Sequence, residues 1–154
     1  MAPAPEGLEL IPLPNRSVQI SWDQYSCDNA DEIQIWRRIG SFDYEPDNCE
    51  VGIPEGSGYK LIGTTEGDQI TMLDDNLGQG LAPGSKYCYR ILAEFPLPEG
   101  GTSYVSEEKC IIINANAPVI TNVSVMDTDI FEGKVELSWV PPFEIDTVLF
   151  PKPY

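Results

Sequence analysis

The stretch that decides the fold runs from residue 81 to residue 91 and reads Leu81-Ala82-Pro83-Gly84-Ser85-Lys86-Tyr87-Cys88-Tyr89-Arg90-Ile91. Pro83 and Gly84 form a pair that is typical of tight turns. After this turn, apolar or aromatic residues alternate with mostly polar ones from Lys86 to Phe95. A period of two residues predicts a half-buried β-strand, with Tyr87 and Tyr89 facing inward and Cys88 and Arg90 facing outward.

Tyr87 stands at the start of this strand, directly after a Leu-x-Pro-Gly turn. A tyrosine in that position can return its hydroxyl to the backbone of the turn while its ring enters the core between two sheets, as in the tyrosine corner of immunoglobulin-like sandwiches. The predicted core signature is therefore Leu81, Pro83 and Tyr87, together with Trp22 upstream. This signature predicts a fold and specifies no reaction.

Other segments with strand-like patterns surround this stretch. Trp22 shares one face of its segment with Val18 and Ile20, so we expect it to be a buried packing residue. Seven strands are predicted in all, at residues 8–10, 17–22, 32–39, 59–64, 69–73, 86–95 and 103–113. This number and spacing predict an all-β, immunoglobulin-like sandwich of two sheets.

The sequence begins to repeat after residue 118. Lys134-Val135-Glu136-Leu137-Ser138-Trp139 resembles Ser17-Val18-Gln19-Ile20-Ser21-Trp22 at an offset of 139 − 22 = 117 residues, which indicates tandem modules. We expect a linker at 1–7, a sandwich at 8–113, a second linker at 114–118 and the N-terminal part of an incomplete second module at 119–154.

The charge and composition exclude several classes of function. The chain has 9 Lys and Arg against 25 Asp and Glu, a net charge of −16, which would repel nucleic acids and anionic membranes. It has no histidine and no Gly-x-Ser-x-Gly motif, so no nucleophile and base for acyl transfer are evident, and we expect no enzyme. Neither a nucleic-acid partner nor membrane insertion is expected.

Four cysteines, at positions 27, 49, 88 and 110, lack the close spacing of a zinc site. Cys88 and Cys110 are centred on a predicted hairpin turn near residue 99, so a disulfide can join them across the two strands. That leaves Cys27 to pair with Cys49. Two such bonds indicate an oxidising compartment, so we expect a secreted or cell-surface protein. Residues 1–5 do not resemble a signal peptide, so we expect a piece of a longer secreted chain.

Two regions are candidates for ligand binding. Asp74, Asp75 and Asn76 could hold calcium, although Ser85 stands where an EF-hand loop needs an acid; the alternative is a turn closed by hydrogen bonds. The long loop at 40–58 brings Phe42 and Tyr44 close to Trp36, and these rings could stack on a sugar. The alternative for the loop is a structural role, in which it covers Trp36 and is tethered to the sheet.

The order Trp22, Ile33-x-Ile35 and Leu81-x-Pro83-Gly84-x-x-Tyr87 resembles the fibronectin type III module. A more detailed resemblance is to modules of the secreted "gliding motility-associated C-terminal domain" proteins of Bacteroidota. The matching pieces are Cys27, Trp36-Arg37-Arg38, Pro46-x-x-Cys49-Glu50-x-Gly52-Ile53-Pro54, Gly58-Tyr59, Ile62-Gly63-Thr64, Asp74-Asp75, Gly78-x-Gly80-Leu81, Tyr87-Cys88-Tyr89-Arg90-Ile91, Glu108-x-Cys110, Pro118-x-Ile120-Thr121-x-Val123-Ser124-Val125, Glu144-x-Asp146-Thr147 and Pro151-x-Pro153-Tyr154.

This resemblance implies a surface repeat protein exported by the type IX secretion system, with a role in adhesion, spacing or surface assembly and a possible link to gliding motility. Its partners would be neighbouring modules of the same chain, surface proteins or glycans, and it implies no catalytic residue. Thr147 lies in Asp146-Thr147-Val148, which resembles the O-glycosylation motif of that phylum; an unmodified turn is the alternative. Two alternative functions stay open: a glycan- or calcium-binding module, and an accessory module of a secreted hydrolase.

Overall fold

The computed structural model describes residues 2–44, 50–98, 100–114, 119–129 and 131–140. The chain divides into two compact units, Met1–Ile113 and Asn114–Tyr154, and each is described by itself. The predicted boundary at residue 113 falls at this division. Most of the predicted second linker, residues 115–118, lies outside the described residues.

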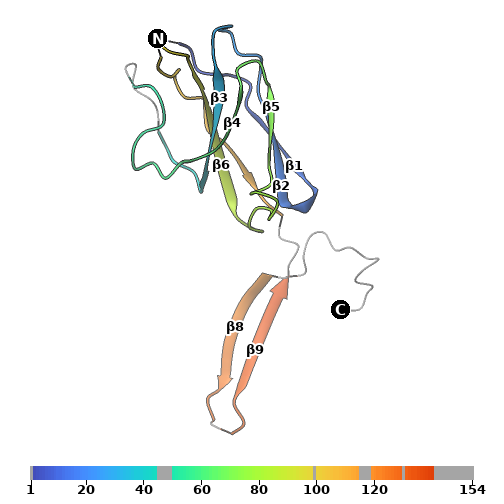
Figure 1. Cartoon of the computed structure of the whole chain (residues 1–154). Coiled ribbons are helices and arrows are strands. Elements are labelled where there is room, and N and C mark those ends of the chain that lie inside the picture. The colour runs from blue at the N-terminus through green and yellow to red at the C-terminus, as the bar shows by residue number, and fades with distance from the viewer. Residues whose placement is uncertain (1, 45–49, 99, 115–118, 130, 141–154) are drawn as a thin grey trace. The chain divides into compact units, whose positions relative to one another are not determined.

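The first unit is a sandwich of two antiparallel sheets (Figure 1). A short 3₁₀ turn, Pro14–Arg16, joins the first two strands. One sheet has the order β1-β2-β5, with β1 at Glu9–Leu13, β2 at Ser17–Ser21 and β5 at Thr71–Asp74. The other has the order β4-β3-β6-β7, with β4 at Lys60–Glu66, β3 at Glu32–Ile39, β6 at Lys86–Glu94 and β7 at Lys109–Ile112. The predicted all-β, immunoglobulin-like sandwich of seven strands is confirmed.

The core lies between the two sheets and is built from side chains that alternate along their strands. Val18 and Ile20 of β2 meet Ile33 and Ile35 of β3, and all four are fully buried. Trp22, directly after β2, is also buried in this core. The remaining buried members of the cluster are Leu8, Tyr25, Leu81, Tyr87, Tyr89, Ile91, Ala93 and Ile113. Burial of these apolar surfaces is the main force that joins the two sheets.

The tyrosine corner is formed at the start of β6. The Tyr87 ring is buried, and its hydroxyl accepts a hydrogen bond of 3.0 Å from the backbone N–H of Ala82. Gly84 has a positive φ of 75° and donates its N–H to the carbonyl of Ile113 over 2.8 Å. The turn is therefore fixed at both ends, to the strand that it starts and to the last residue of the sandwich.

The expected alternation along β6 is wrong, because this strand is buried on both faces. Every residue from Tyr87 to Ala93 is buried, including Cys88, Arg90 and Leu92 on the outer face. The cause is a second layer of irregular chain, part of the loop at 40–58 and the segment at 103–108, which contacts the outer face through Arg90. Local alternation does not reveal such a layer.

Strand β7 is shorter than expected. Only Lys109–Ile112 pair regularly with β6, whereas residues 103–108 were predicted to belong to the same strand. In that segment the hydroxyls of Ser103 and Ser106 accept hydrogen bonds of 2.9 Å from the backbone N–H groups of Ala93 and Ile91. The serine side chains thus replace backbone carbonyls as acceptors, so the N–H groups of Ala93 and Ile91 stay paired where the chain leaves the ladder.

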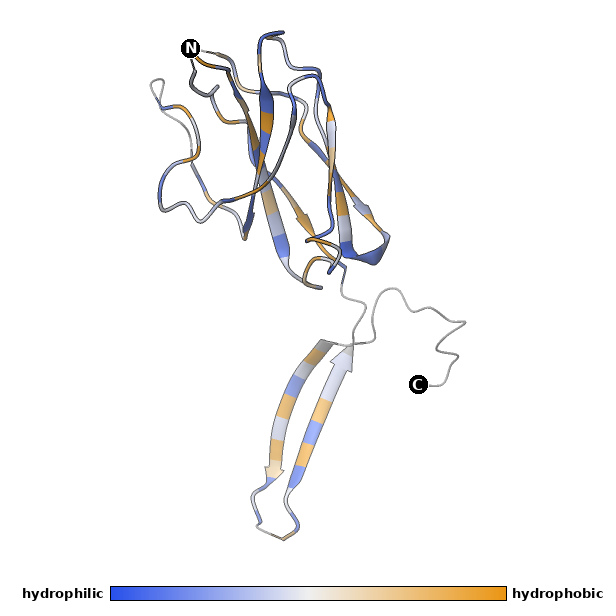
Figure 2. Ribbon diagram, in the orientation of Figure 1, coloured by the Kyte–Doolittle hydropathy of each residue, from blue (hydrophilic) through white to orange (hydrophobic). Residues whose placement is uncertain are grey.

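The described part of the second unit is a two-stranded hairpin of β8, Val119–Asp127, and β9, Lys134–Val140. Its register pairs Ile120 with Trp139, Val123 with Leu137 and Val125 with Val135. All six of these side chains are at least half exposed, and Figure 2 shows hydrophobic and hydrophilic residues alternating along both strands. The hairpin is therefore amphipathic, as expected for the first two strands of a sandwich.

The tyrosine corner can be tested with two substitutions of Tyr87. Removing only the hydroxyl in Tyr87→Phe should lower the free energy of unfolding by about 1 kcal/mol, the usual net value of one hydrogen bond. Removing the ring in Tyr87→Ala, or the indole in Trp22→Ala, should cost about 3 to 5 kcal/mol. Urea unfolding measures both, with Leu77→Ala as a control because Leu77 is 96% exposed. Equal losses for Tyr87→Phe and Leu77→Ala would contradict the structural role of the hydroxyl.

Candidate functional site

The candidate site lies on the outer face of the four-stranded sheet, where arginines and aromatic rings gather. In the register of β3 and β6, Trp36 is opposite Arg90 and Arg38 is opposite Cys88. The rings of Phe42 and Tyr44, from the loop that follows β3, and of Tyr59, just before β4, lie against these arginines. We call Arg38, Phe42, Tyr44, Tyr59 and Arg90 the arginine–aromatic cluster.

The rings of the cluster are stacked on guanidinium groups. The Arg38 guanidinium lies 5.1 Å from the ring centre of Phe42 and 5.9 Å from that of Tyr59. The Arg90 guanidinium lies 5.8 Å from the ring centre of Tyr44. Phe42 and Tyr44 also stack on each other, with centroids 6.2 Å apart. These contacts attach the loop to the sheet by cation–π attraction.

Arg90 is the buried centre of the cluster, with 5% of its surface exposed. Its Nη1 donates to the carbonyl of Ser106 over 2.8 Å, and its Nη2 donates to the carbonyl of Tyr44 over 3.1 Å. A buried guanidinium is tolerated only when its charge and its donors are compensated. Here two loop carbonyls satisfy Nη1 and Nη2, and one ring and the nearby Glu108 carboxylate compensate the charge. Only Nε is buried without an acceptor among the described residues.

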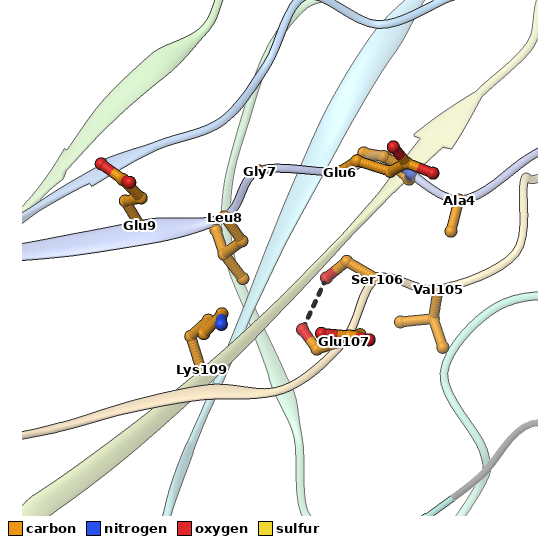
Figure 3. A pocket seen from close by; sticks show the side chains of 10 residues that line it. Ala4, Glu6, Gly7, Leu8, Glu9, Val105, Ser106, Glu107 and Lys109 are labelled. Carbon is orange, nitrogen blue, oxygen red and sulfur yellow. Dashed lines mark hydrogen bonds between the residues drawn. The ribbon is translucent and has the colours of Figure 1, made fainter.

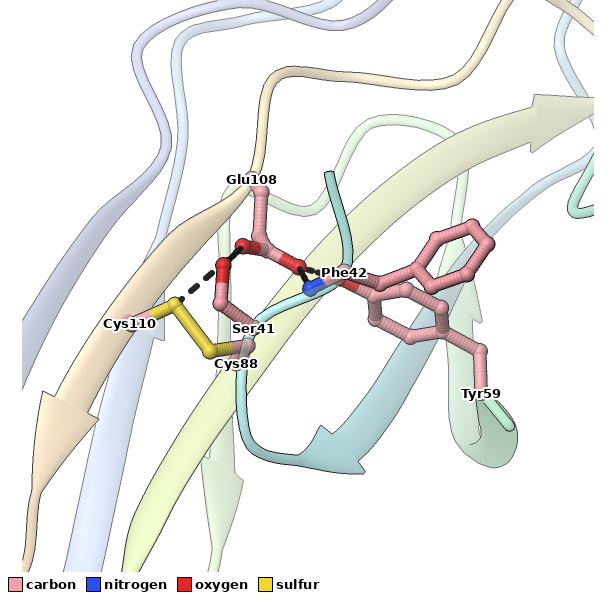
Figure 4. Close-up of a disulfide and its surroundings, with 6 residues drawn as sticks. All are labelled: Ser41, Phe42, Tyr59, Cys88, Glu108 and Cys110. Carbon is pink, nitrogen blue, oxygen red and sulfur yellow. Dashed lines mark hydrogen bonds between the residues drawn. A yellow bond between two sulfur atoms is a disulfide. The ribbon is translucent and has the colours of Figure 1, made fainter. Parts of the chain in front are cut away.

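Glu108 holds the first residues of the loop, Ser41 and Phe42, and also Tyr59, which follows the loop (Figure 4). Its carboxylate accepts hydrogen bonds from the Ser41 hydroxyl, the Tyr59 hydroxyl and, over 2.9 Å, the backbone N–H of Phe42. Burial alone would raise the pKa of Glu108, but these three donors and the charge of Arg90 outweigh it and lower the pKa below the ordinary value. The ionised carboxylate is therefore the form that the folded loop favours.

The opposite shift occurs in Tyr59, the partner of Glu108. Burial, and then the hydrogen bond to the Glu108 carboxylate, raise the pKa of the Tyr59 phenol. Tyr59 therefore stays protonated and donates to Glu108. A pair with pKa values displaced in this way can belong to a catalytic site or to a structural contact, and here both groups hold the loop on the sheet.

The predicted disulfide between Cys88 and Cys110 is confirmed. The two residues are directly opposite in the register of β6 and β7, and their sulfurs are bonded. Figure 4 places the disulfide beside Ser41 and Glu108. Cys88, Glu108 and Cys110 are the one group in the described part of the chain with metal-ligand spacing, but sulfurs in a disulfide are not thiolate ligands. The bond indicates an oxidising, extracellular type of environment.

The second predicted pairing stays a prediction. Cys27 carries a free thiol in the structure and packs at the edge of the core, and Cys49 lies outside the described residues. Burial and, after it, the neighbouring Cys27 raise the pKa of Tyr25 to about 12. The predicted glycosylation residue, Thr147, also lies outside the described residues.

The candidate calcium ligands lie at the last residue of β5, Asp74, and in the polar turn that follows it. Asp74 is buried, and Arg37 Nη1 donates to both of its carboxylate oxygens over 2.8 Å. The Tyr89 hydroxyl also donates to Asp74 over 2.8 Å, and Asn76 accepts from Arg37 over 3.1 Å. Calcium would have to displace these donors, so the geometry favours a turn closed by hydrogen bonds over a calcium loop.

The candidate sugar-stacking residues do not form one open platform. Phe42 and Tyr44 lie against arginines, as described above. Trp36 is partly buried, and its indole N–H donates to the side-chain oxygen of Gln34 over 3.1 Å. The rings therefore serve the contact between loop and sheet, which is the structural alternative for this loop.

The sequence prediction gave no role to Arg38, Tyr59, Arg90 or Glu108. Arg90 was assigned only to the outer face of its strand, and all four residues also fall within the pieces that carry the family resemblance. The one signal in the sequence was that arginines are expected on the outer face of strands close to a long loop with aromatic residues. Neither the position of the arginines nor the composition of the loop shows which carbonyl or carboxylate lies next to each guanidinium group.

Among the described residues of the first unit, two of the hollows have a defined lining. One, of about 500 Å³, lies between the N-terminal segment Ala4–Glu9 and the segment Val105–Lys109 (Figure 3). Its walls carry the carboxylates of Glu6, Glu9 and Glu107 and the amino group of Lys109. The other, of about 300 Å³, is lined by Arg37, Arg38, Ile39, Gly58, Lys60 and Tyr87, and it contains three basic residues.

The role of Glu108 can be tested through pH. Because its pKa is lowered in the folded state, ionised Glu108 stabilises the fold above its unfolded pKa, and this contribution is lost as the pH falls through the folded value. Glu108→Gln should therefore cost about 1 to 2 kcal/mol of unfolding free energy at neutral pH and less at pH values below about 4.

Glu107→Gln is the matched control, because the Glu107 side chain is exposed. Urea unfolding of the two variants and the wild type at both pH values gives the comparison. A loss for Glu108→Gln that is equal at both pH values would mean that the carboxylate charge does not hold the loop.

No family model matches the sequence, and neither does any curated protein. Among solved structures, similarity is found to a myokine (TM-score 0.49, 15% identity, 73% of this chain and 98% of that chain). It is also found to the Clostridium perfringens spore cortex lytic enzyme SleM (TM-score 0.46, 17% identity, 73% and 28%) and to the twitchin kinase region of C. elegans (TM-score 0.49, 19% identity, 86% and 20%). At these identities the likeness concerns the fold alone. No helix among the described residues is long and apolar enough to cross a membrane.

Proposed function

We propose that the chain is a non-enzymatic structural and interaction module of a large secreted or cell-surface protein, in which successive sandwich modules serve adhesion, spacing or surface assembly. The observation that carries the proposal is the repeat of the β2 sequence Ser17–Trp22 at Lys134–Trp139. The repeat lies on β9, and its neighbour β8 pairs with it as β1 pairs with β2. Repetition of one folding unit is typical of spacer and adhesive proteins.

The chemistry of the outer face supports the same proposal. Its polar groups are engaged with each other: Arg90 with two loop carbonyls, and Glu108 with three donors. Such a network stabilises the loop, and it commits Arg90 and Glu108 to structural contacts. The cross-strand disulfide adds to the stability of the module, because it restricts the conformational freedom of the unfolded chain and keeps β7 on the sheet.

Within this proposal, which the resemblance to type IX secretion proteins supports, the module acts on or outside the cell surface. The disulfide is consistent with such a location, and so is an acidic surface that keeps an exported protein soluble. Attachment to the surface and a link to gliding motility belong to the proposal for the parent protein.

Location can be tested with antibodies raised against residues 1–113. We expect them to label intact cells of the source organism or to recover the protein from the medium. Peptide mapping of the unreduced protein should show Cys88 joined to Cys110 and Cys27 joined to Cys49. Recovery from the cytosol alone, with four reduced thiols, would overturn the extracellular assignment.

The calcium alternative predicts a different result in thermal unfolding. A calcium site saturated 100-fold above its Kd would add about 2.7 kcal/mol to the stability of the folded chain. Because Arg37 and Tyr89 already occupy Asp74, we expect the same Tm in millimolar calcium and in EDTA, with magnesium as a control. A calcium-specific rise in Tm that Asp75→Asn abolishes would favour the binding alternative.

A further inference from the structure

The disulfide between Cys88 and Cys110 has a carboxylate directly beside it. Glu108 Oε2 lies 3.4 Å from the Cys110 sulfur, a contact that Figure 4 draws as a dashed line. A sulfur in a disulfide carries no proton to donate, so this contact is not a hydrogen bond. The fold therefore holds an acidic group against one sulfur of the bond without gaining a hydrogen bond from it.

The carboxylate is fixed in this position by the loop. Its Oε1 accepts from the backbone N–H of Phe42 over 2.9 Å and from the Tyr59 hydroxyl, and its Oε2 accepts from the Ser41 hydroxyl. Although burial acts in the opposite direction, these donors and the charge of Arg90 lower the pKa of Glu108. No described Lys or Arg forms an ion pair with Glu108, so its negative charge is not cancelled by direct contact.

The two sulfurs of the bond differ in their access to solvent. Cys88 is fully buried in β6, whereas Cys110 is exposed on β7. A reducing thiol therefore reaches the Cys110 sulfur, which is the one beside Glu108. In thiol–disulfide exchange the attacking species is the thiolate, because the thiol itself is a poor nucleophile.

The reduction has two balanced steps when the reductant is a dithiol. Its thiolate forms a new bond to the Cys110 sulfur, the bond to Cys88 breaks, and the electron pair leaves on the Cys88 sulfur, which takes a proton from water. The second thiolate of the dithiol then displaces Cys110 and closes the oxidised, cyclic form of the reductant. Two electrons thus pass from the dithiol to the protein, and the first step must bring an anion up to Glu108.

From these contacts we infer that Glu108 protects the Cys88–Cys110 disulfide against reduction by thiols, because it holds a negative charge at the sulfur that a thiolate must approach. One unit charge at a distance of about 4 Å in water changes such a rate about fivefold. The net charge of −16 acts in the same direction over longer distances. The protection selects by charge, so anionic thiols are slowed and neutral reductants are not. This inference goes beyond the proposed structural role, which does not depend on it.

The test compares the full, oxidised chain with Glu108→Gln, whose amide keeps an oxygen toward the loop and removes the charge. With dithiothreitol, we expect Glu108→Gln to lose the Cys88–Cys110 bond about fivefold faster than the wild type at low salt. The difference should shrink at high salt, because dissolved ions screen the charge. Alkylation of quenched samples and peptide mass spectrometry follow this bond separately from the other cysteines.

A neutral phosphine, tris(hydroxypropyl)phosphine, separates the effect of charge from that of structure. It attacks sulfur without carrying a negative charge, so we expect the wild type and Glu108→Gln to react with it at the same rate. A change that only loosened the loop would accelerate both reductants. Glu107→Gln is the matched control, since it removes an exposed neighbouring carboxylate, and it should keep the wild-type rate with dithiothreitol.

Three outcomes would overturn the inference. Equal acceleration of Glu108→Gln by the thiol and by the phosphine would mean that Glu108 acts only by holding the loop. An unchanged rate with dithiothreitol would mean that the thiolate does not meet the carboxylate charge. Equal acceleration in Glu107→Gln would assign the effect to the overall negative charge of the chain. In each case the antibody test of the proposed function keeps its own outcome.

Discussion

The sandwich depends on the burial of both faces of strand β6. Its inner face, with Tyr87, Tyr89 and Ile91, closes the core against β2 and β5. Its outer face carries Cys88 and Arg90, and both are buried. Arg90 cannot be buried under apolar side chains alone, because its guanidinium group needs hydrogen-bond acceptors. The chain provides the acceptors from two irregular segments, the carbonyl of Tyr44 on one side and that of Ser106 on the other. The long loop and the segment before β7 therefore meet at one buried arginine.

A second buried charge acts between the sheets. Asp74, at the end of β5, is bound by Arg37 of β3 and by Tyr89 of β6, so that one carboxylate joins both layers of the sandwich. Burial first, and then the Asp74 charge, raise the pKa of Tyr89, which keeps its hydroxyl protonated as a donor. An ion pair of this kind adds little net stability compared with apolar packing, but breaking it leaves a charge without a partner. Its effect is to fix the end of β5 against β3 and β6 in one alignment.

Much of this fold follows from local sequence patterns. Residues close together in the sequence determine the Leu-x-Pro-Gly turn before Tyr87 and the alternation in β2 and β3. The burial of Trp22, Ile33 and Ile35 in the core agrees with these patterns. The disulfide between Cys88 and Cys110 was predictable because hairpin symmetry fixes which residues face each other. The alternation along β6 wrongly predicted an exposed outer face, because Arg90 and Cys88 are covered by segments that are distant in the sequence. The serine hydroxyls that replace β7 as acceptors are likewise set by tertiary contacts, and no periodicity encodes them.

The same contacts determine which polar groups of the module already have a partner inside the fold. Arg90 donates to two loop carbonyls and Glu108 accepts from donors on the loop and on Tyr59, so a ligand that took either group would have to break contacts that hold the loop. Arg37 is also bound, to Asp74, whereas Arg38 and Lys60 have no ion-pair partner among the described residues. Two adjacent residues of β3 therefore have different structural roles. Arg37 joins the two sheets through Asp74, and Arg38 holds the rings of Phe42 and Tyr59 against the outer face of the four-stranded sheet.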